Sequence, residues 1–239
     1  MFSRFFTPQF FESGDLTLDG SEAHHLIHVM RIKPGEIVEL FDGQGQTGQA
    51  EVVSVKKRDV ELRILTICCE APPSSEIIIG TAVPKGDRFA WLIEKATELG
   101  VTRIVPLTTV RSSSDPRDSK LERLRQTVVS ACKQSGRNRI LEIAPVTMWS
   151  EFVRHEFPNR SAYIAHPADP IQTDLRQPFL GKPNSSMLFA IGPEGGFTDE
   201  EFRLAIAAGG KPISLGPLIL RVETAVLAVA ALGLARQCL

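Results

Sequence analysis

Residues 186–202 have the sequence SMLFAIGPEGGFTDEEF and decide the fold of the chain. The apolar run 186–191 predicts a buried strand, and the glycines of 192–196 predict a loop. Thr198 and Glu201 then predict a capping box at the start of a helix, with a phenylalanine on each side as a hydrophobic staple. A strand, a glycine-rich loop and a helix in this order are typical of α/β proteins that bind a ligand at the loop.

The alternation of strands and helices continues on both sides of this stretch. Residues 77–83 and 103–107 predict apolar strands, and between them apolar residues recur at helical spacing up to Leu99, with Gly100 in the position of a glycine C-cap. Further strands are predicted over 163–165 and 211–215, and further helices over 121–131 and from about 223. Residues 74–239 therefore predict an α/β domain with a mostly parallel sheet and helices on both faces.

The first seventy residues have a different pattern. Apolar runs at 36–41, 49–55 and 60–65 are separated by turn residues and predict a hairpin followed by a third strand. Two prolines and two serines within residues 71–75 are typical of a linker. The sequence therefore predicts a small β domain of residues 1–70 ahead of the α/β domain.

Charge is balanced over the whole chain but not along it. The chain has 27 basic and 28 acidic side chains, a balance that excludes a generally basic nucleic-acid protein. Residues 1–70 have 7 basic and 11 acidic side chains, whereas 117–139 have 7 basic and 2 acidic ones, a local balance of +5. Such a cluster suits a phosphate backbone, although a solvated helix face is the commoner explanation.

Composition argues against a metal site and against a membrane protein. His24 and His28 are one helical turn apart, but no third ligand with zinc spacing follows and the four cysteines form no CxxC pair. The longest apolar run, near 226–235, is about half of the span that a bilayer needs. We expect no bound metal, no membrane segment and a cytoplasmic location.

The loop at 192–196 is neither GxGxxG nor a Walker loop, and Glu194 would repel a phosphate. It favours a cationic or hydroxyl-bearing ligand, although a tight turn before a capped helix is an equally simple interpretation. A second loop, Gly216-Pro217, leads to Arg221 and Glu223, and we expect the two loops to lie side by side at one edge of the sheet. The helix that follows is apolar on nearly every face, which predicts that it is central or buried against a second subunit.

Several short motifs follow one another in a fixed order across nearly the whole chain. They are His24-His25 with Val29-Met30-Arg31 and Phe41-Asp42-Gly43, Pro84-Lys85-Gly86, Glu98-Leu99-Gly100-Val101, Gln134-Ser135-Gly136-Arg137-Asn138, the segment 191–197, and 215–225 with Leu220-Arg221-Val222-Glu223-Thr224-Ala225. In this order they resemble the RsmE family of ribosomal RNA small-subunit uridine N3-methyltransferases. The chain departs from the family pattern at Val110, Leu218 and Val222, where Glu, Arg and Thr are common.

The resemblance implies a PUA-like β-barrel domain followed by a SPOUT-type α/β domain with a C-terminal trefoil knot that binds S-adenosylmethionine. It also implies a homodimer through the C-terminal knot helix and small-subunit ribosomal RNA as the substrate. The cofactor-binding residues that we predict are His166, Pro167, Ile191, Gly192, Pro193, Glu194, Gly195, Gly196, Leu215, Gly216, Leu220, Glu223, Thr224 and Ala225.

A cation that stabilises negative charge on the base oxygens would lower the barrier to methyl transfer to the uracil nitrogen. We predict that Arg221 supplies it as the catalytic residue. The predicted RNA-binding residues are Arg4, Arg31, Lys120, Arg123, Arg137, Asn138 and Arg139. Two alternatives remain: a non-catalytic RNA-binding or ribosome-assembly protein, and an α/β enzyme with a nucleotide cofactor.

Overall fold

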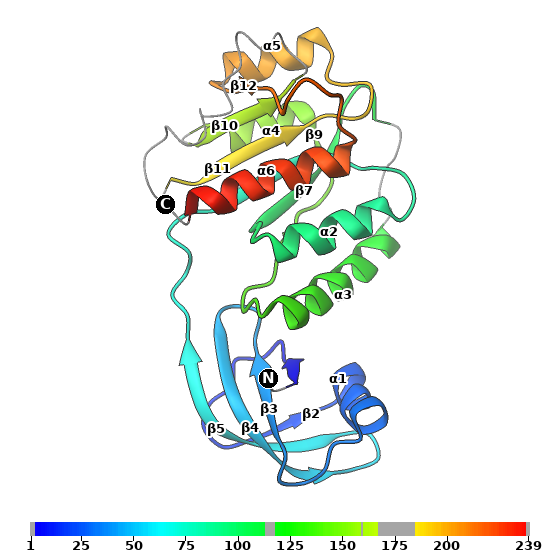
Figure 1. Cartoon of the computed structure of the whole chain (residues 1–239), viewed down its shortest axis with the longest axis vertical. Helices are drawn as coiled ribbons and strands as arrows, with labels where there is room; N and C mark the ends of the chain where they lie inside the picture. The colour runs from blue at the N-terminus through cyan, green and yellow to red at the C-terminus, as the bar shows by residue number, and fades with distance from the viewer. Residues whose placement is uncertain (1–2, 113–117, 159, 167–184, 238–239) are drawn as a thin grey trace. The chain divides into compact units, whose positions relative to one another are not determined.

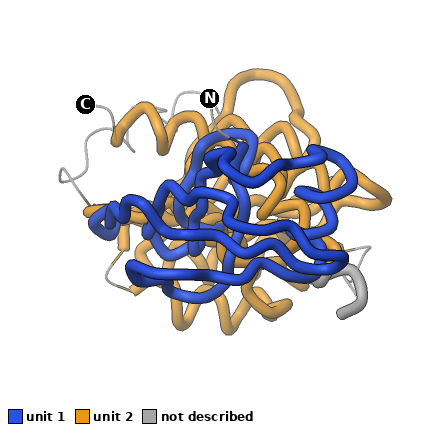
Figure 2. The backbone as a smooth tube through the Cα atoms, turned by 90° about the horizontal axis from the view of Figure 1, so that it is seen from below, with its two compact units in different colours: residues 1–72, 132–140 blue, residues 73–131, 141–239 orange. Residues whose placement is uncertain are grey.

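A computed structural model describes residues 3–112, 118–158, 160–166 and 185–237, which form two compact units. Unit 1 consists of residues 1–72 and 132–140, and unit 2 consists of 73–131 and 141–239 (Figure 2). The first division falls between Pro72 and Pro73, within the predicted linker. The sequence did not predict that residues 132–140 belong to the first unit.

Unit 2 is built on a seven-stranded parallel sheet, as the sequence predicts (Figure 1). The strand order is β12-β10-β11-β6-β7-β8, and β9 pairs with β7. The central strands are uniformly buried because helices cover both faces. The strands are β6 (Ile77–Ala82), β7 (Arg103–Thr108), β8 (Glu142–Ile143), β9 (Thr147–Met148), β10 (Ser161–Ala165), β11 (Met187–Ile191) and β12 (Lys211–Ile213).

Helices α2 (Arg88–Glu98) and α6 (Val222–Gln237) pack against each other, and α6 also packs on β6 and β11. Helix α4 (Trp149–Glu156) contacts β7, β9 and α5 (Asp199–Ala207), and with α5 it encloses the core of the other face. Helix α3 (Asp118–Ser135) begins in unit 2, and its last residues belong to unit 1. Successive residues of β6 serve both faces: Ile77 meets Gly233 of α6, whereas Ile78 belongs to the core beneath α4.

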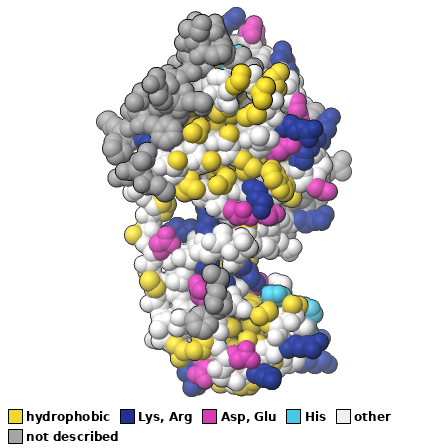
Figure 3. Space-filling view, in the orientation of Figure 1, with side chains coloured by type: hydrophobic (Ala, Val, Ile, Leu, Met, Phe, Trp, Pro, Cys, Tyr) yellow, Lys and Arg dark blue, Asp and Glu magenta, His cyan; other side chains and the backbone are white. Residues whose placement is uncertain are grey.

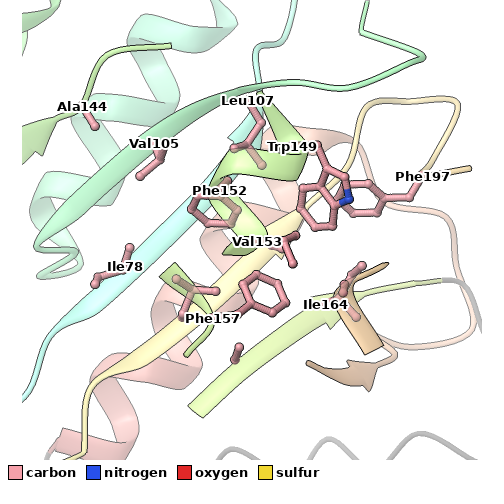
Figure 4. Packing of buried hydrophobic residues seen from close by; sticks show 14 residues of the cluster. Ile78, Val105, Leu107, Ala144, Trp149, Phe152, Val153, Phe157, Ile164 and Phe197 are labelled. Carbon is pink, nitrogen blue, oxygen red and sulfur yellow. The ribbon is translucent and has the colours of Figure 1, made fainter. Parts of the chain in front are cut away.

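An aromatic cluster forms the core beneath α4 (Figure 4). The indole of Trp149 lies against the ring of Phe197, with ring centroids 4.4 Å apart, and it meets Phe157 edge-on. Phe152 packs over Gly80 of β6 so closely that a Cβ at position 80 would lie 2.3 Å from the ring. The large rings are therefore accommodated by a strand residue that has no side chain.

The helix ends follow the sequence signals. Gly100 has φ +77°, and the amides of Gly100 and Val101 donate to the carbonyls of Thr97 and Ala96, so the predicted glycine C-cap is confirmed. The predicted capping box of α5 is confirmed as well. The hydroxyl of Thr198 accepts from the amide of Glu201 at 3.2 Å, and the Glu201 carboxylate accepts from the amide of Thr198 at 2.9 Å.

Unit 1 is a curled five-stranded sheet with the order β1-β3-β4-β5-β2, in keeping with the predicted PUA-like domain. Its hairpin strands match the predicted runs, but the parallel pairing of β1 with β3 was not predicted. A helix and a π-helical turn follow β2. The elements are β1 (Arg4–Phe6), β2 (Asp15–Leu18), α1 (Gly20–His24), the π-helical turn His25–Met30, β3 (Ile37–Phe41), β4 (Gln46–Val55) and β5 (Val60–Cys69).

Residues 132–140 are held in unit 1 by Arg4 and by two glycines. The buried Arg4 guanidinium forms an ion pair with Glu39 at 3.0 Å, donates to the carbonyl of Cys132 at 3.0 Å and contacts the side-chain oxygen of Asn138. Ile140 lies where a Cβ on Gly43 would be, and the guanidinium of Arg139 lies in the same way against Gly45. Within the described ranges of both units, no helix is long and apolar enough to cross a membrane.

Candidate functional site

The candidate site lies at the carboxyl ends of three neighbouring parallel strands. β11 leads into the loop 192–196, β6 into Lys85 and Arg88, and β7 into Arg111. The segment before α6 brings Arg221 to the same edge, because α6 packs on β6 and β11. This edge is where ligands bind in open α/β sheets.

The two glycine-containing loops, 192–196 and the one at Gly216-Pro217, line one cavity of about 400 Å³. The prediction that they lie side by side is therefore confirmed. Most of the predicted cofactor residues line this cavity; they are His166, Ile191, Gly192, Pro193, Glu194, Gly195, Gly196, Leu215, Gly216, Leu220 and Ala225. Pro167 lies outside the described residues. Apolar side chains dominate the walls, as is typical of sites for planar organic ligands.

Three predicted residues have other positions. Glu223 is buried, and one of its carboxylate oxygens lies 3.6 Å from the Arg88 guanidinium. Thr224 is exposed on α6. Neither residue lines the glycine-loop cavity in the described chain, and Arg221 lines a neighbouring pocket instead.

Seven further residues line the cavity that are not among the named cofactor-binding residues. Phe197 was assigned only to the helix start, although the same ring forms a wall of the cavity. The exposed Leu218 and Ile219 follow Gly216-Pro217 directly, so their position in this loop could have indicated that they line the cavity. The seven are Ala165, Phe197, Ser214, Pro217, Leu218, Ile219 and Val222.

His166 is the titratable group of the cavity with a shifted pKa. Its Nδ1 is buried and has no hydrogen-bond partner among the described residues, and its ring lies 4.4 Å from that of Phe202. Burial lowers the pKa of His166, and the charge of Asp199 opposes this only in part. The imidazole at the cavity is therefore neutral near pH 7.

A second, open pocket of about 540 Å³ adjoins the cavity, because Glu194 and Gly195 line both. Its other walls are Lys85, Arg88, Arg111 and Arg221. The catalytic candidate Arg221 is thus exposed beside the loop that lines the cavity.

Two hydrogen bonds fix the loop that carries Arg111. The Glu201 carboxylate accepts from the amide of Val110 at 2.8 Å, and the Arg111 guanidinium donates to the carbonyl of Gly195 at 2.5 Å. A side chain at position 195 would meet Arg111, with Cβ to Cδ 3.2 Å. The loop after β7 is therefore attached both to α5 and to the glycine-rich loop.

The predicted RNA-binding residues divide into exposed and engaged groups. Arg31 and Arg123 are exposed, whereas Arg4 is buried. Arg139 donates to the carbonyl of Glu70 at 2.6 Å, Asn138 to the Glu70 carboxylate at 3.1 Å, and the Arg137 guanidinium to the carbonyl of Arg139. Burial lowers the pKa of Arg137. Lys120 lies in α3, and its side chain is outside the described part.

Comparisons with known proteins agree with this architecture. Residues 71–233 match the model of an RNA methyltransferase domain, and residues 18–65 match that of an RNA methyltransferase PUA domain. Ribosomal RNA small subunit methyltransferase E of Synechocystis sp. is 33% identical over 217 residues, which cover 88% of this chain and 69% of that protein.

Two solved structures contain the cofactor. A methyltransferase of Legionella pneumophila in complex with S-adenosylmethionine has a TM-score of 0.88 at 32% identity, and the match covers 98% of each chain. Ribosomal RNA small subunit methyltransferase E of Neisseria gonorrhoeae, bound to S-adenosylmethionine, has a TM-score of 0.87 at 30% identity and covers 97% of this chain and 96% of that one.

The fold and these similarities define an RNA methyltransferase with a SPOUT-type domain behind a PUA-like domain. Its cofactor is S-adenosylmethionine, and the mostly apolar walls of the glycine-loop cavity suit an adenosine. Within this class, the chain belongs to the ribosomal RNA small subunit methyltransferase E family.

Proposed function

We propose that the protein transfers the methyl group of S-adenosylmethionine to N3 of a uridine in small-subunit ribosomal RNA. The observation that carries this proposal is the shared wall between the glycine-loop cavity and the cationic pocket with Arg221. One side suits the cofactor and the other an anionic strand. Membership of the family, whose relatives are named for this RNA, supports the substrate class.

The loops 191–196 and 214–220, with Val222 and Ala225 in the first turn of α6, hold the cofactor in this proposal. Bound S-adenosylmethionine supplies an electrophilic methyl group on a sulfonium sulfur. The apolar side chains of the cavity pack on the adenosine and exclude water from the reacting atoms. The main task of the site is to hold the acceptor nitrogen and the methyl group in line.

Arg221 acts on the uracil. The N3 proton passes to solvent water, which leaves negative charge on the base oxygens, and the Arg221 guanidinium stabilises that charge. Arg221 cannot take the proton itself, because a guanidinium stays protonated in proteins. Its exposure beside the cavity leaves it accessible to a base that enters from solution.

The RNA strand is held by arginines that are free to meet it. Arg31 in unit 1 and Arg123 in unit 2 are exposed and serve as phosphate contacts. Lys120 belongs to the same proposal by its place in the basic stretch. Arg4, Arg137, Asn138 and Arg139 act chiefly by fixing residues 132–140 within unit 1.

Two copies of the chain associate through α6 in this proposal. Residues 225–235 of the helix are all apolar or glycine, and Thr224, Ala231 and Ala235 are exposed along it. In Figure 3 hydrophobic side chains gather on the face where Figure 1 shows α6. Ala231→Arg should give a monomer in sedimentation analysis, and Ala207→Arg on exposed α5 is the control. The trefoil knot and the cytoplasmic location stay predictions.

The decisive test is methyl transfer to small-subunit RNA from a strain that lacks the gene. Wild type should add one methyl group to one uridine, detected by mass spectrometry. Arg221→Ala should lower kcat by about 10²–10³-fold and keep the cofactor affinity, because the cation acts only on developing charge. Arg203→Ala on α5 is the matched control. Cofactor binding without any transfer by wild type would favour a non-catalytic RNA-binding protein.

A further inference from the structure

The pocket beside the cofactor cavity has an excess of positive charge. Four cationic side chains line it, and Glu194 is its one lining carboxylate among the described residues. The loop after β6 places Lys85 three residues before the first residue of α2, so the positive end of that helix adds to the field. The pocket therefore favours an anionic group over a neutral one.

The four cations differ in how far they are already paired. Arg88 lies 3.6 Å from the buried Glu223 carboxylate, so part of its charge is compensated. Arg111 donates to the neutral carbonyl of Gly195 and keeps its full charge. Lys85 is exposed and has no hydrogen bond or ion pair within the described ranges. Three charges, those of Lys85, Arg111 and Arg221, are thus available to a ligand.

We propose that Lys85 and Arg111 hold a phosphodiester group of the RNA next to the uridine that is methylated. The inference rests on the proposed methyl transfer and adds a specific substrate contact to it. A planar guanidinium and a flexible ammonium are the two side chains that bind phosphate most readily. Because Glu194 and Gly195 separate this pocket from the cavity, a phosphate held here brings its own nucleotide to the cofactor. Arg221 then remains available to contact the uracil ring.

The test uses the full chain saturated with S-adenosylhomocysteine and uridine 3′,5′-bisphosphate as the ligand, measured by calorimetry. Lys85→Gln and Arg111→Gln should each weaken bisphosphate binding about tenfold, because each removes one charge-assisted contact. Binding of uridine, which has no phosphate, should be equal in wild type and variants. Lys211→Gln, at an exposed lysine of the same unit outside both pockets, should behave as wild type.

In methyl transfer Lys85→Gln, which leaves the hydrogen bond between Arg111 and Gly195 intact, should raise KM for RNA and leave kcat and its pH profile unchanged. Unchanged bisphosphate affinity in both variants would overturn the proposal. Weaker S-adenosylhomocysteine binding by Lys85→Gln would assign the pocket to the cofactor carboxylate. A shifted pH profile of kcat in that variant would assign the pocket to the ionised uracil. Either result would also overturn the proposal. A wild type that transfers no methyl group, but whose bisphosphate binding depends on Lys85, would refute the proposed function and support the phosphate pocket.

Discussion

Glu201 accepts a hydrogen bond from the amide of Val110, 91 residues earlier, while the other oxygen of the same carboxylate closes the capping box of α5. The backbone carbonyl of Glu201 accepts from the Trp149 indole at 3.0 Å. One buried residue therefore joins the helix start, the aromatic core and the loop that carries Arg111.

Glu201→Gln should destabilise the fold. An amide replaces one acceptor oxygen with a donor, so one of the two backbone N–H groups loses its partner, at a cost of about 1–3 kcal/mol. Denaturant unfolding measures this difference. Glu200→Gln alters the exposed neighbour in the same helical turn and should change stability by less than about 0.5 kcal/mol. Equal effects of the two substitutions would contradict the assigned role.

His166 should make stability fall in acid. Burial lowers its folded-state pKa below the usual 6.5, so the unfolded chain binds a proton first as the pH falls. Stability is unaffected by this group above about pH 6.5, decreases from there down to the folded-state pKa, and is constant below it. His166→Gln should flatten that part of the pH dependence in thermal unfolding curves. His155→Gln, at an exposed histidine of α4, is the control.

Gly43→Ala should destabilise unit 1 more than Gly35→Ala. Both glycines have positive φ, +77° and +88°, so each alanine has a similar backbone strain of about 1 kcal/mol. A Cβ at position 35 meets nothing within 4 Å, but one at position 43 would lie 2.5 Å from the Ile140 side chain. Overpacking should add about 1–3 kcal/mol at position 43 only. Equal losses in chemical unfolding would show that residues 132–140 do not depend on this contact.

Arg4→Lys should lower stability rather than RNA affinity. Lysine cannot reproduce the planar guanidinium, which contacts both the Glu39 carboxylate and the Cys132 carbonyl. Losing these contacts of a buried cation costs about 3 kcal/mol or more of folding stability. The salt dependence of RNA binding should keep the wild-type slope. Arg31→Ala should show the opposite pattern, with normal unfolding and a slope reduced by about 0.7–0.9. A reduced slope for Arg4→Lys would restore its predicted place in the RNA contact.

Local signals predicted the cavity well because its parts are contiguous in sequence. A strand, glycines and a capping box within 186–202 specify one loop, and the sheet then brings the second loop beside it. Local signals could not predict whether an individual charged side chain is buried or which partner it contacts. Arg4 is buried and donates to the carbonyl of Cys132, 128 residues away, and Glu223 lies beside Arg88. Periodicity gives the face of an element, whereas such pairs depend on the complete fold.

The assembly of unit 1 from residues 1–72 and 132–140 also bears on how this domain is inherited. A recombination event with a single crossover after Pro72 would transfer a sheet that lacks Arg139 and Ile140, with Gly43 and Gly45 left facing solvent. Such a fragment should be incomplete as a folding unit. We therefore expect the two domains to be inherited together. The small domain is not one contiguous segment that a single recombination event could transfer to another enzyme.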